Sequence, residues 1–388
     1  MEYSFLKINI QSPFPTTACG HSCQTVELFD YHDPLFARVF SFRDDDLWLI
    51  HFSFDLLAFD LEHRNQLEDY FRSYYHDDRI KVIASTTHTH YANSVRGNEY
   101  VDYLCDLLKK EVVTMEYRPV NDVTVSYQKM HSTAVGKSRI SGYETDNETL
   151  GLIRFYEEGN NFFNIIYYNC HPTILEAHTP YFSAEYPGYV LAGLEEKMPN
   201  ADFTFLQGAA GDISSRFVRD GQDYEALTKL GDNLLKDIDL LINADTKIVP
   251  LNLSYKEKEI IFEHEFTPID LTKIRADLSD RELETIRLGQ IEREKLEKKN
   301  SLIFDKPIDK GLICVTDFGP VRTIFFPNEI FSEYINYTNK EKDLLVSYSN
   351  GYGPYVLPID FSYITYEMFT DTMARSSKEE IIHTLKTI

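Results

Sequence analysis

Apolar segments of strand length alternate with segments of helical spacing along most of this 388-residue chain. The apolar runs 36–42 and 47–57 flank the polar turn 43–46 and predict two paired strands. A helix is predicted over 62–76, and a buried strand is predicted after it, over 79–85. Because strands alternate with helices, the pattern favours an α/β fold with a mixed β-sheet core and flanking helices.

The same alternation continues to the C-terminus. Further strands are predicted over 150–155, 162–168, 202–206, 311–318 and 321–326. Further helices are predicted over 100–113, 186–197, 224–242 and 376–388. Residues 268–300 interrupt this pattern, because they are rich in Glu, Lys, Arg and Leu and contain few aromatic residues. We expect a single domain over 1–388 with a solvated helical insertion at 268–300.

The charge and the apolar segments argue against several partners. The chain has 39 Lys and Arg against 62 Asp and Glu, a net charge of −23. Phosphate backbones and anionic membranes repel such a surface, so we expect no nucleic-acid partner. No uninterrupted apolar stretch approaches the ~18 residues that a membrane-spanning helix needs. The five cysteines are scattered and the first residues lack a signal-peptide pattern, so we expect a cytoplasmic protein.

Two histidines follow the predicted strand 79–85, in the block Thr86-Thr87-His88-Thr89-His90. In an extended chain, residues two apart point to the same side. His88 and His90 can therefore aim their rings at one point, as a metal site needs. The alternative is a pair of hydrogen-bonded structural histidines at a strand end.

A third histidine follows the predicted strand 162–168. Pro172 cannot donate to a sheet ladder, so the strand should stop there and leave His171 at its exit. Ligands of open α/β sheets gather at the carboxyl ends of strands. A single histidine at the end of one strand is usually structural. Histidines at the ends of two different strands indicate a functional site.

Other blocks add polar groups at strand ends. The glycine-rich segment 207–214 lacks the Lys of a P-loop, and its Ser214 is either a nucleophile or a helix N-cap. Glu329 follows Pro327 and can complete a His/His/Glu metal set, or it can lie at a helix N-terminus. The turn 350–355 carries tyrosines that can bind a metal, stabilise an oxyanion or simply pack around the turn.

Taken together and in chain order, these blocks resemble the catalytic domain of the neutral/alkaline (non-lysosomal) ceramidases, from about residue 35 to residue 370. The matching blocks are Thr86–His90, His171–Thr173, Ser183–Tyr189, Gln207–Asp212, Pro327–Glu329 and Asn350–Tyr355. Segments 37–38 and 55–57 are similar to early landmarks of the family. The resemblance implies a ceramidase-like α/β catalytic domain, in a short form without the family's C-terminal immunoglobulin-like domain.

The resemblance also implies a metal. Members of the family hydrolyse the N-acyl amide of ceramide with one zinc ion. We expect one zinc per chain, held by His88, His171, Glu329 and Tyr355. His90 can replace His88 in this set, and Tyr352 can replace Tyr355.

The remaining predicted catalytic residues also come from the resemblance. His90 is the acid/base neighbour of the metal, and Ser214 lies beside the scissile amide. Arg139 matches an arginine near the substrate carbonyl, with Lys137 as the competing match, and Tyr366 matches a further active-site tyrosine. The chemistry agrees, since zinc lowers the pKa of bound water to about 7 and a nearby histidine can protonate the leaving amine.

The expected function is zinc-dependent hydrolysis of a linear amide in a small, lipid-like substrate. Segment 91–97 after the histidines lacks the family's glycine-rich turn, a departure that concerns substrate access more than the metal. One alternative is therefore a zinc hydrolase of another soluble N-acyl compound or ester. The other is a non-catalytic protein that binds a lipid or a sugar.

Overall fold

The computed structural model describes residues 1–20, 27–95, 99–299 and 310–388, so Cys23 and residue 300 of the expected insertion lie outside it. One five-stranded sheet has the order β6-β5-β4-β1-β8, in which β5 and β6 are parallel and the other pairs antiparallel. Its strands are β1 (Glu2–Asn9), β4 (Phe36–Arg43), β5 (Trp48–Phe54), β6 (Ile80–Thr86) and β8 (Arg118–Pro119).

A second five-stranded sheet has the order β13-β12-β11-β9-β15, again with one parallel pair, β12 and β13. Its strands are β9 (Thr124–His131), β11 (Thr149–Glu157), β12 (Asn160–Tyr168), β13 (Asp202–Gln207) and β15 (Ile248–Pro250). The two sheets pack face to face through aromatic side chains. The ring centroids of Phe40 and Phe163 are 4.8 Å apart, and those of Phe42 and Phe155 are 5.4 Å apart.

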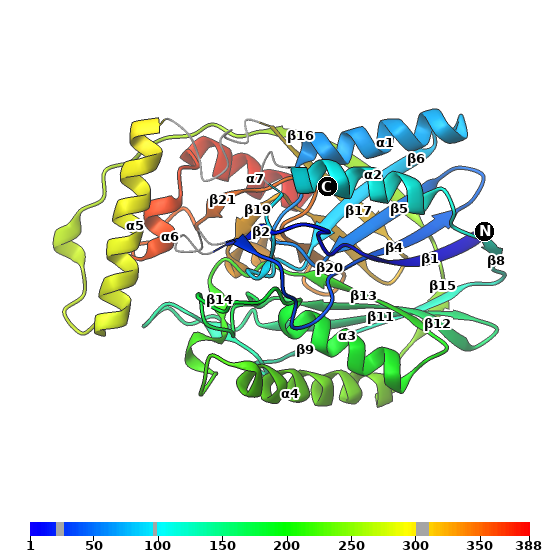
Figure 1. The fold of residues 1–388 in the computed structure, drawn as a ribbon, viewed down its shortest axis with the longest axis horizontal. Coiled ribbons are helices and arrows are strands. Elements are labelled where there is room, and N and C mark those ends of the chain that lie inside the picture. Colours follow the sequence, from blue (N-terminus) through cyan, green and yellow to red (C-terminus); the bar gives the residue numbers. More distant parts are fainter. Residues whose placement is uncertain (21–26, 96–98, 300–309) are drawn as a thin grey trace.

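Two pairs of helices cover the outer faces of these sheets (Figure 1). The helices α1 (Leu61–Tyr75) and α2 (Glu99–Val112) pack on the first sheet, and α3 (Glu185–Lys197) and α4 (Tyr224–Asn243) pack on the second. In α4 the buried positions include Leu227, Leu230, Leu234, Ile238 and Leu241, spaced three or four residues apart as one helix face requires. The result is a helix–sheet–sheet–helix arrangement.

The remaining strands form smaller sheets. A four-stranded sheet has the order β16-β17-β18-β20, with strands β16 (Ser254–Ile261), β17 (Lys310–Asp317), β18 (Arg322–Phe325) and β20 (Asp343–Val346). The two-stranded pairs are β10 (Lys137–Ser138) with β14 (Ile213–Ser214) and β19 (Asn328–Ile330) with β21 (Gly353–Val356). The short strands β2 (Thr16–Cys19), β3 (Glu27–Leu28) and β7 (Ala92–Asn93) form a further sheet.

The segment expected as an insertion contains the long helix α5 (Asp280–Lys299), preceded by the 3-10 turn η2 (Leu271–Lys273). This helix lies at one end of the molecule beside α6 (Tyr366–Thr370) (Figure 1). The last helix is α7 (Arg375–Thr387), and two further 3-10 turns are η1 (Ser215–Phe217) and η3 (Ser332–Tyr337). That 1–388 forms a single domain stays a prediction.

The observed elements confirm the predicted α/β fold class and each strand and helix that the sequence predicted, with ends that shift by a few residues. The pattern missed β1, β9 and β16, whose burial is too mixed to give a clear alternation. Cys105, Cys170 and Cys314 are buried thiols. Among the described helices, none is both long and apolar enough to cross a membrane.

Candidate metal centre

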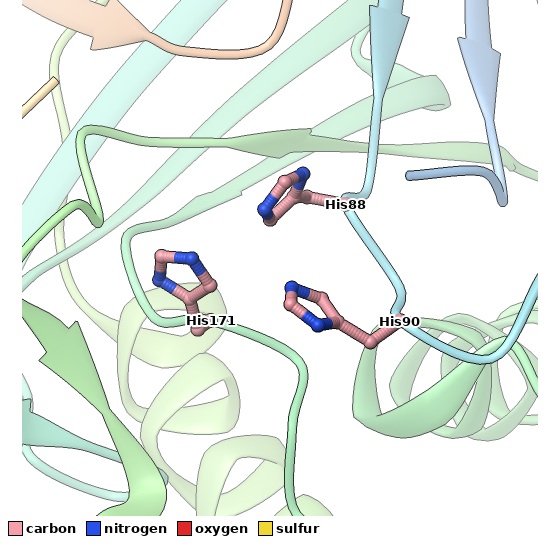
Figure 2. Close-up of side chains that lie close together, drawn as sticks. All are labelled: His88, His90 and His171. Carbon is pink, nitrogen blue, oxygen red and sulfur yellow. The ribbon is translucent and has the colours of Figure 1, made fainter. Parts of the chain in front are cut away.

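Three histidines converge where strands of the two main sheets end. His88 and His90 lie in the loop after β6, and His171 lies in the loop after β12 (Figure 2). One ring nitrogen of each lies within 4.8 Å of the others. The predicted convergence is therefore confirmed, but the reason given for it is wrong. The chain is not extended here, because His88 has a φ of 63°, in the left-handed region.

Backbone carbonyls fix the orientation of two of these rings. Nδ1 of His88 lies 2.8 Å from the carbonyl oxygen of Leu57, and Nδ1 of His171 lies 2.6 Å from that of Ala210. A carbonyl oxygen only accepts hydrogen bonds, so each Nδ1 carries a proton. In a neutral ring, Nε2 then presents a lone pair, which is the usual arrangement of a histidine that binds a metal.

The carboxylate of Glu329 faces both of these lone pairs. Its Oε2 lies 3.0 Å from Nε2 of His171 and 3.4 Å from Nε2 of His88. Burial lowers the pKa of His171 to about 4, so its ring is neutral near pH 7. Nitrogen lone pairs directed at a carboxylate repel it unless a cation lies between them. The donor set of His88, His171 and Glu329 therefore fits a divalent metal ion such as zinc.

Strand pairing brings Glu329 to this point. Glu329 lies on β19 opposite Tyr355 of β21, not at the helix N-terminus that was the alternative. The glycine-rich loop packs against the same strand, since the N–H of Gly211 donates to the carbonyl of Ile330 at 2.9 Å. A Cβ on Gly211 would lie 2.9 Å from the carbonyl oxygen of Glu329. This glycine therefore permits the close approach of two backbones.

The two candidate tyrosines have different partners. The hydroxyl of Tyr352 donates to Oε1 of Glu329. Burial and the Glu329 carboxylate both raise the pKa of Tyr352 well above its usual value, so this proton stays on the tyrosine. The hydroxyl of Tyr355 instead accepts a hydrogen bond from Nη2 of Arg139 at 3.0 Å, and its ring lies 6.4 Å from that of His171. Which tyrosine would bind the metal stays open.

Arg139 and Tyr366 lie on the Tyr355 side of the centre. Nη2 of Arg139 donates to the carbonyl of Gly211 at 2.7 Å and lies 2.9 Å from the carboxylate of Glu367. Arg139 is 9 % exposed, whereas the competing Lys137 lies exposed on β10. The ring of Tyr366 lies 6.3 Å from that of Tyr355. The structure thus brings Arg139 rather than Lys137 to the site.

His90 completes the three-histidine cluster, and Ser214 lies beside His171. His90 is the most exposed of the three histidines, and the backbone of Gly20 packs on its ring. Ser214 pairs through its backbone with His171, and its hydroxyl accepts the N–H of Arg216 at 3.3 Å. Ser214 therefore forms the predicted N-cap, of the short turn η1. Catalytic roles for His90 and Ser214 stay predictions.

Comparison with known proteins shows which fold this chain has. No family model and no curated protein matches this sequence. The crystal structure of the neutral ceramidase from Pseudomonas aeruginosa is similar with a TM-score of 0.74 at 13% identity, covering 99% of this chain and 73% of that chain. A structure of ceramidase complexed with C2 is similar with a TM-score of 0.76 at 13% identity, covering 99% and 74%. The chain has the neutral ceramidase fold. This confirms, for the fold, the resemblance that the ordered motifs indicated.

Within this neutral ceramidase fold, the structure adds residues that the sequence did not indicate. The ring of Tyr348 stacks on that of His88 with centroids 3.7 Å apart. Tyr348 and Asn350 have φ values of 53° and 55°, so strained backbone gathers around the centre. Asn350 holds the end of β6, because its N–H donates to the carbonyl of Ala84 at 2.6 Å. The motif 350–355 contained Asn350, whereas no sequence signal distinguished Tyr348 from the chain's other tyrosines.

Proposed function

We propose that this protein is a zinc-dependent hydrolase that cleaves the N-acyl amide bond of a small, lipid-like substrate. The observation that carries the proposal is the convergence of His88, His171 and Glu329, in which nitrogen lone pairs and a carboxylate face one point. The likeness to ceramidases supports an amide as the bond that is cleaved. When bound, zinc would polarise the amide carbonyl and lower the pKa of a bound water to about 7.

The side chains of this protein supply the other requirements of amide hydrolysis. Because Arg139 already donates to the Tyr355 oxygen, the proton of Tyr355 must be donated elsewhere, and a substrate oxyanion is a suitable acceptor. Burial raises the pKa of Tyr355 well above its usual value, so that proton is present near pH 7. In this proposal His90, the most exposed of the three histidines, protonates the leaving amine.

Metal content read together with hydrolysis tests this proposal. We expect about one zinc per chain in the wild-type protein after zinc is offered, and almost none in His171→Ala. His383→Ala is the matched control, because His383 is exposed on α7 away from the centre. Hydrolysis of a short-chain N-acyl sphingosine and of an N-acyl ethanolamine should follow the zinc content and stop when a chelator is added.

Different outcomes separate the parts of the proposal. If the protein bound zinc and cleaved a matched ester but neither amide, it would still be a zinc hydrolase, but the bond that it cleaves would be an ester. Failure of the wild-type protein to retain zinc, or amide cleavage that survives chelation, would contradict the metal-dependent mechanism.

A further inference from the structure

A pocket lies next to the candidate metal centre, on the side of Tyr355. Arg139, Tyr366 and Glu367 line it, and these residues also surround Tyr355. A group in this pocket can therefore belong to a substrate whose amide lies at the centre. The position makes the pocket's chemistry a determinant of which amide is cleaved.

Three arginines line this pocket beside Glu282 and Glu367, and two of the three arginines are already paired. Nη2 of Arg139 lies 2.9 Å from Glu367, and Nη2 of Arg275 lies 2.6 Å from Asp277. Arg216 also lines the pocket, and although Glu367 and Glu282 act on its charge, neither forms an ion pair with it within 4.0 Å among the residues that the structure describes. Its Nη1 donates to the carbonyl of Arg139 at 3.1 Å, which leaves its other guanidinium N–H groups without an acceptor in that same part of the chain.

The acidic residues near Arg216 are engaged with other groups. Glu282 of α5 accepts hydrogen bonds from the hydroxyls of Ser141 and Ser279. Burial lowers the pKa of Arg216, and Arg139 and Arg281 act in the same direction, whereas the carboxylates of Glu367 and Glu282 act against them. An oxyanion at this point would satisfy the free donors in the two-pronged geometry that guanidinium groups favour.

We propose that Arg216 binds an anionic group of the substrate, so that the preferred substrate is an N-acyl compound bearing a carboxylate or phosphate. This rests on the proposed amide hydrolysis and adds the substrate class to it. The outer wall of the pocket includes Thr285 and Ile286 of α5, so the helix expected as an insertion completes this subsite. A neutral amide such as ceramide has no group that would pair with Arg216.

A matched panel of octanoyl amides tests the substrate class. N-Octanoyl ethanolamine is the neutral parent, N-octanoyl-β-alanine carries a carboxylate, and N-octanoyl O-phosphoethanolamine carries a phosphate. The ethanolamine monoamide of suberic acid carries its carboxylate on the acyl side. We expect the best anionic substrate to exceed the neutral one about 10- to 100-fold in kcat/KM, the effect of one charge-assisted contact. The preferred member distinguishes carboxylate from phosphate.

Two variants connect this preference to the pocket. Arg216→Gln should reduce the anionic-to-neutral ratio of kcat/KM toward one, and Arg216→Lys should keep part of it. Arg287→Gln is the matched control, because Arg287 is an exposed arginine of α5 that pairs with Glu284. It removes the same charge and should leave the ratio unchanged.

A binding measurement separates the pocket from the chemistry. At constant ionic strength, acetate or inorganic phosphate should raise the Tm of the wild-type protein and of Arg287→Gln, but not that of Arg216→Gln. If anions raised the Tm but the protein cleaved no amide, anion binding at Arg216 would be supported and the proposed amide hydrolysis would be contradicted. If kcat/KM for amide cleavage were equal for neutral and anionic substrates, and anions did not change the Tm, the anion-binding role of Arg216 would be contradicted. The proposed hydrolase activity would be unaffected. If both Arg216 variants fail to fold, the wild-type ratio and anion titration decide.

Discussion

The metal centre and the helix α5 are held in different ways. His88 and His171 are fully buried, and each is fixed by a hydrogen bond from Nδ1 to a backbone carbonyl at the end of the main sheets. The helix α5 exposes Leu283, Leu288 and Ile291, and the ion pair of Arg287 with Glu284 is solvent-exposed.

Because of this difference, we expect the two regions to have different roles in the proposed reaction. The ends of the main sheets hold His88 and His171, which the proposed hydrolysis needs. The helix α5 contributes Thr285 and Ile286 to the neighbouring pocket from a more exposed position. We therefore expect changes at the sheet ends to abolish the reaction, and changes in α5 to alter only which substrate reacts.

Glu329→Gln should have the largest effect, because Gln keeps the shape of the side chain and removes the charge that the metal requires. We expect loss of zinc and a fall of about 10³-fold or more in kcat/KM, the equivalent of several kcal/mol. Zinc content and kcat/KM measured on the same preparation test this. Glu284→Gln, which removes an exposed carboxylate of α5, is the control. If Glu329→Gln retained zinc and activity, the carboxylate would not belong to the centre.

Acid should destabilise the sheets that carry the centre, and His51 of β5 is one cause. His51 is buried between Phe40 and Phe325, and burial lowers its pKa to about 3. An unfolded chain binds a proton at His51 below about pH 6.5. The stabilisation is therefore complete above pH 6.5 and is lost as the pH falls toward 3, by up to about 4 kcal/mol.

Urea unfolding across this pH range tests the role of His51. The free energy of unfolding should fall more steeply with acid in the wild-type protein than in His51→Gln, which has no group that titrates there. The comparison between the two proteins removes the contribution of other titrating groups. Parallel curves for the two proteins would show that His51 is not held neutral by the sheets.

Tyr352→Phe should weaken the centre by less than the loss of Glu329. It removes the hydroxyl that donates to Oε1 of Glu329, and loss of such a supporting contact typically costs 10- to 100-fold in metal affinity. Tyr355→Phe removes the partner of Arg139 instead, so it should lower kcat with less effect on zinc affinity. Competition with a chelator measures the affinity, and Tyr100→Phe controls for loss of a buried hydroxyl elsewhere. The reverse result would assign Tyr355 as the metal ligand.

The sequence predicted the parts of this site that depend on local pattern. His88 and His171 follow apolar runs that end at recognisable breaks, so their place at strand exits could be read directly. The orientation of the rings could not, because it depends on the carbonyls of Leu57 and Ala210, which come from distant segments. The same is true of Arg216, whose importance depends on which of the pocket's other charges are already paired.

One substitution made in both regions provides the sharpest comparison. A Cβ on Gly211 would lie 2.9 Å from the backbone oxygen of Glu329, so Gly211→Ala must displace β19 or its own loop. A Cβ on Gly289 of α5 would lie 2.9 Å from the ring of Phe369 and 3.1 Å from the Cα of Tyr366, both on the short helix α6. We expect Gly211→Ala to cost about 1–3 kcal/mol of stability and to reduce zinc retention.

Gly289→Ala should have the smallest effect on stability, because the gain of ~1 kcal/mol in helix propensity opposes the cost of displacing Phe369 and Tyr366. Its zinc content should equal that of the wild type, while KM for the substrates that use the pocket changes, since α5 forms part of the pocket wall. The test is to measure thermal unfolding, zinc content and KM for Gly211→Ala and Gly289→Ala. If Gly289→Ala lost zinc, or if Gly211→Ala changed KM alone, the two regions would not be separable. The helix α5 would then support the metal centre rather than select its substrate.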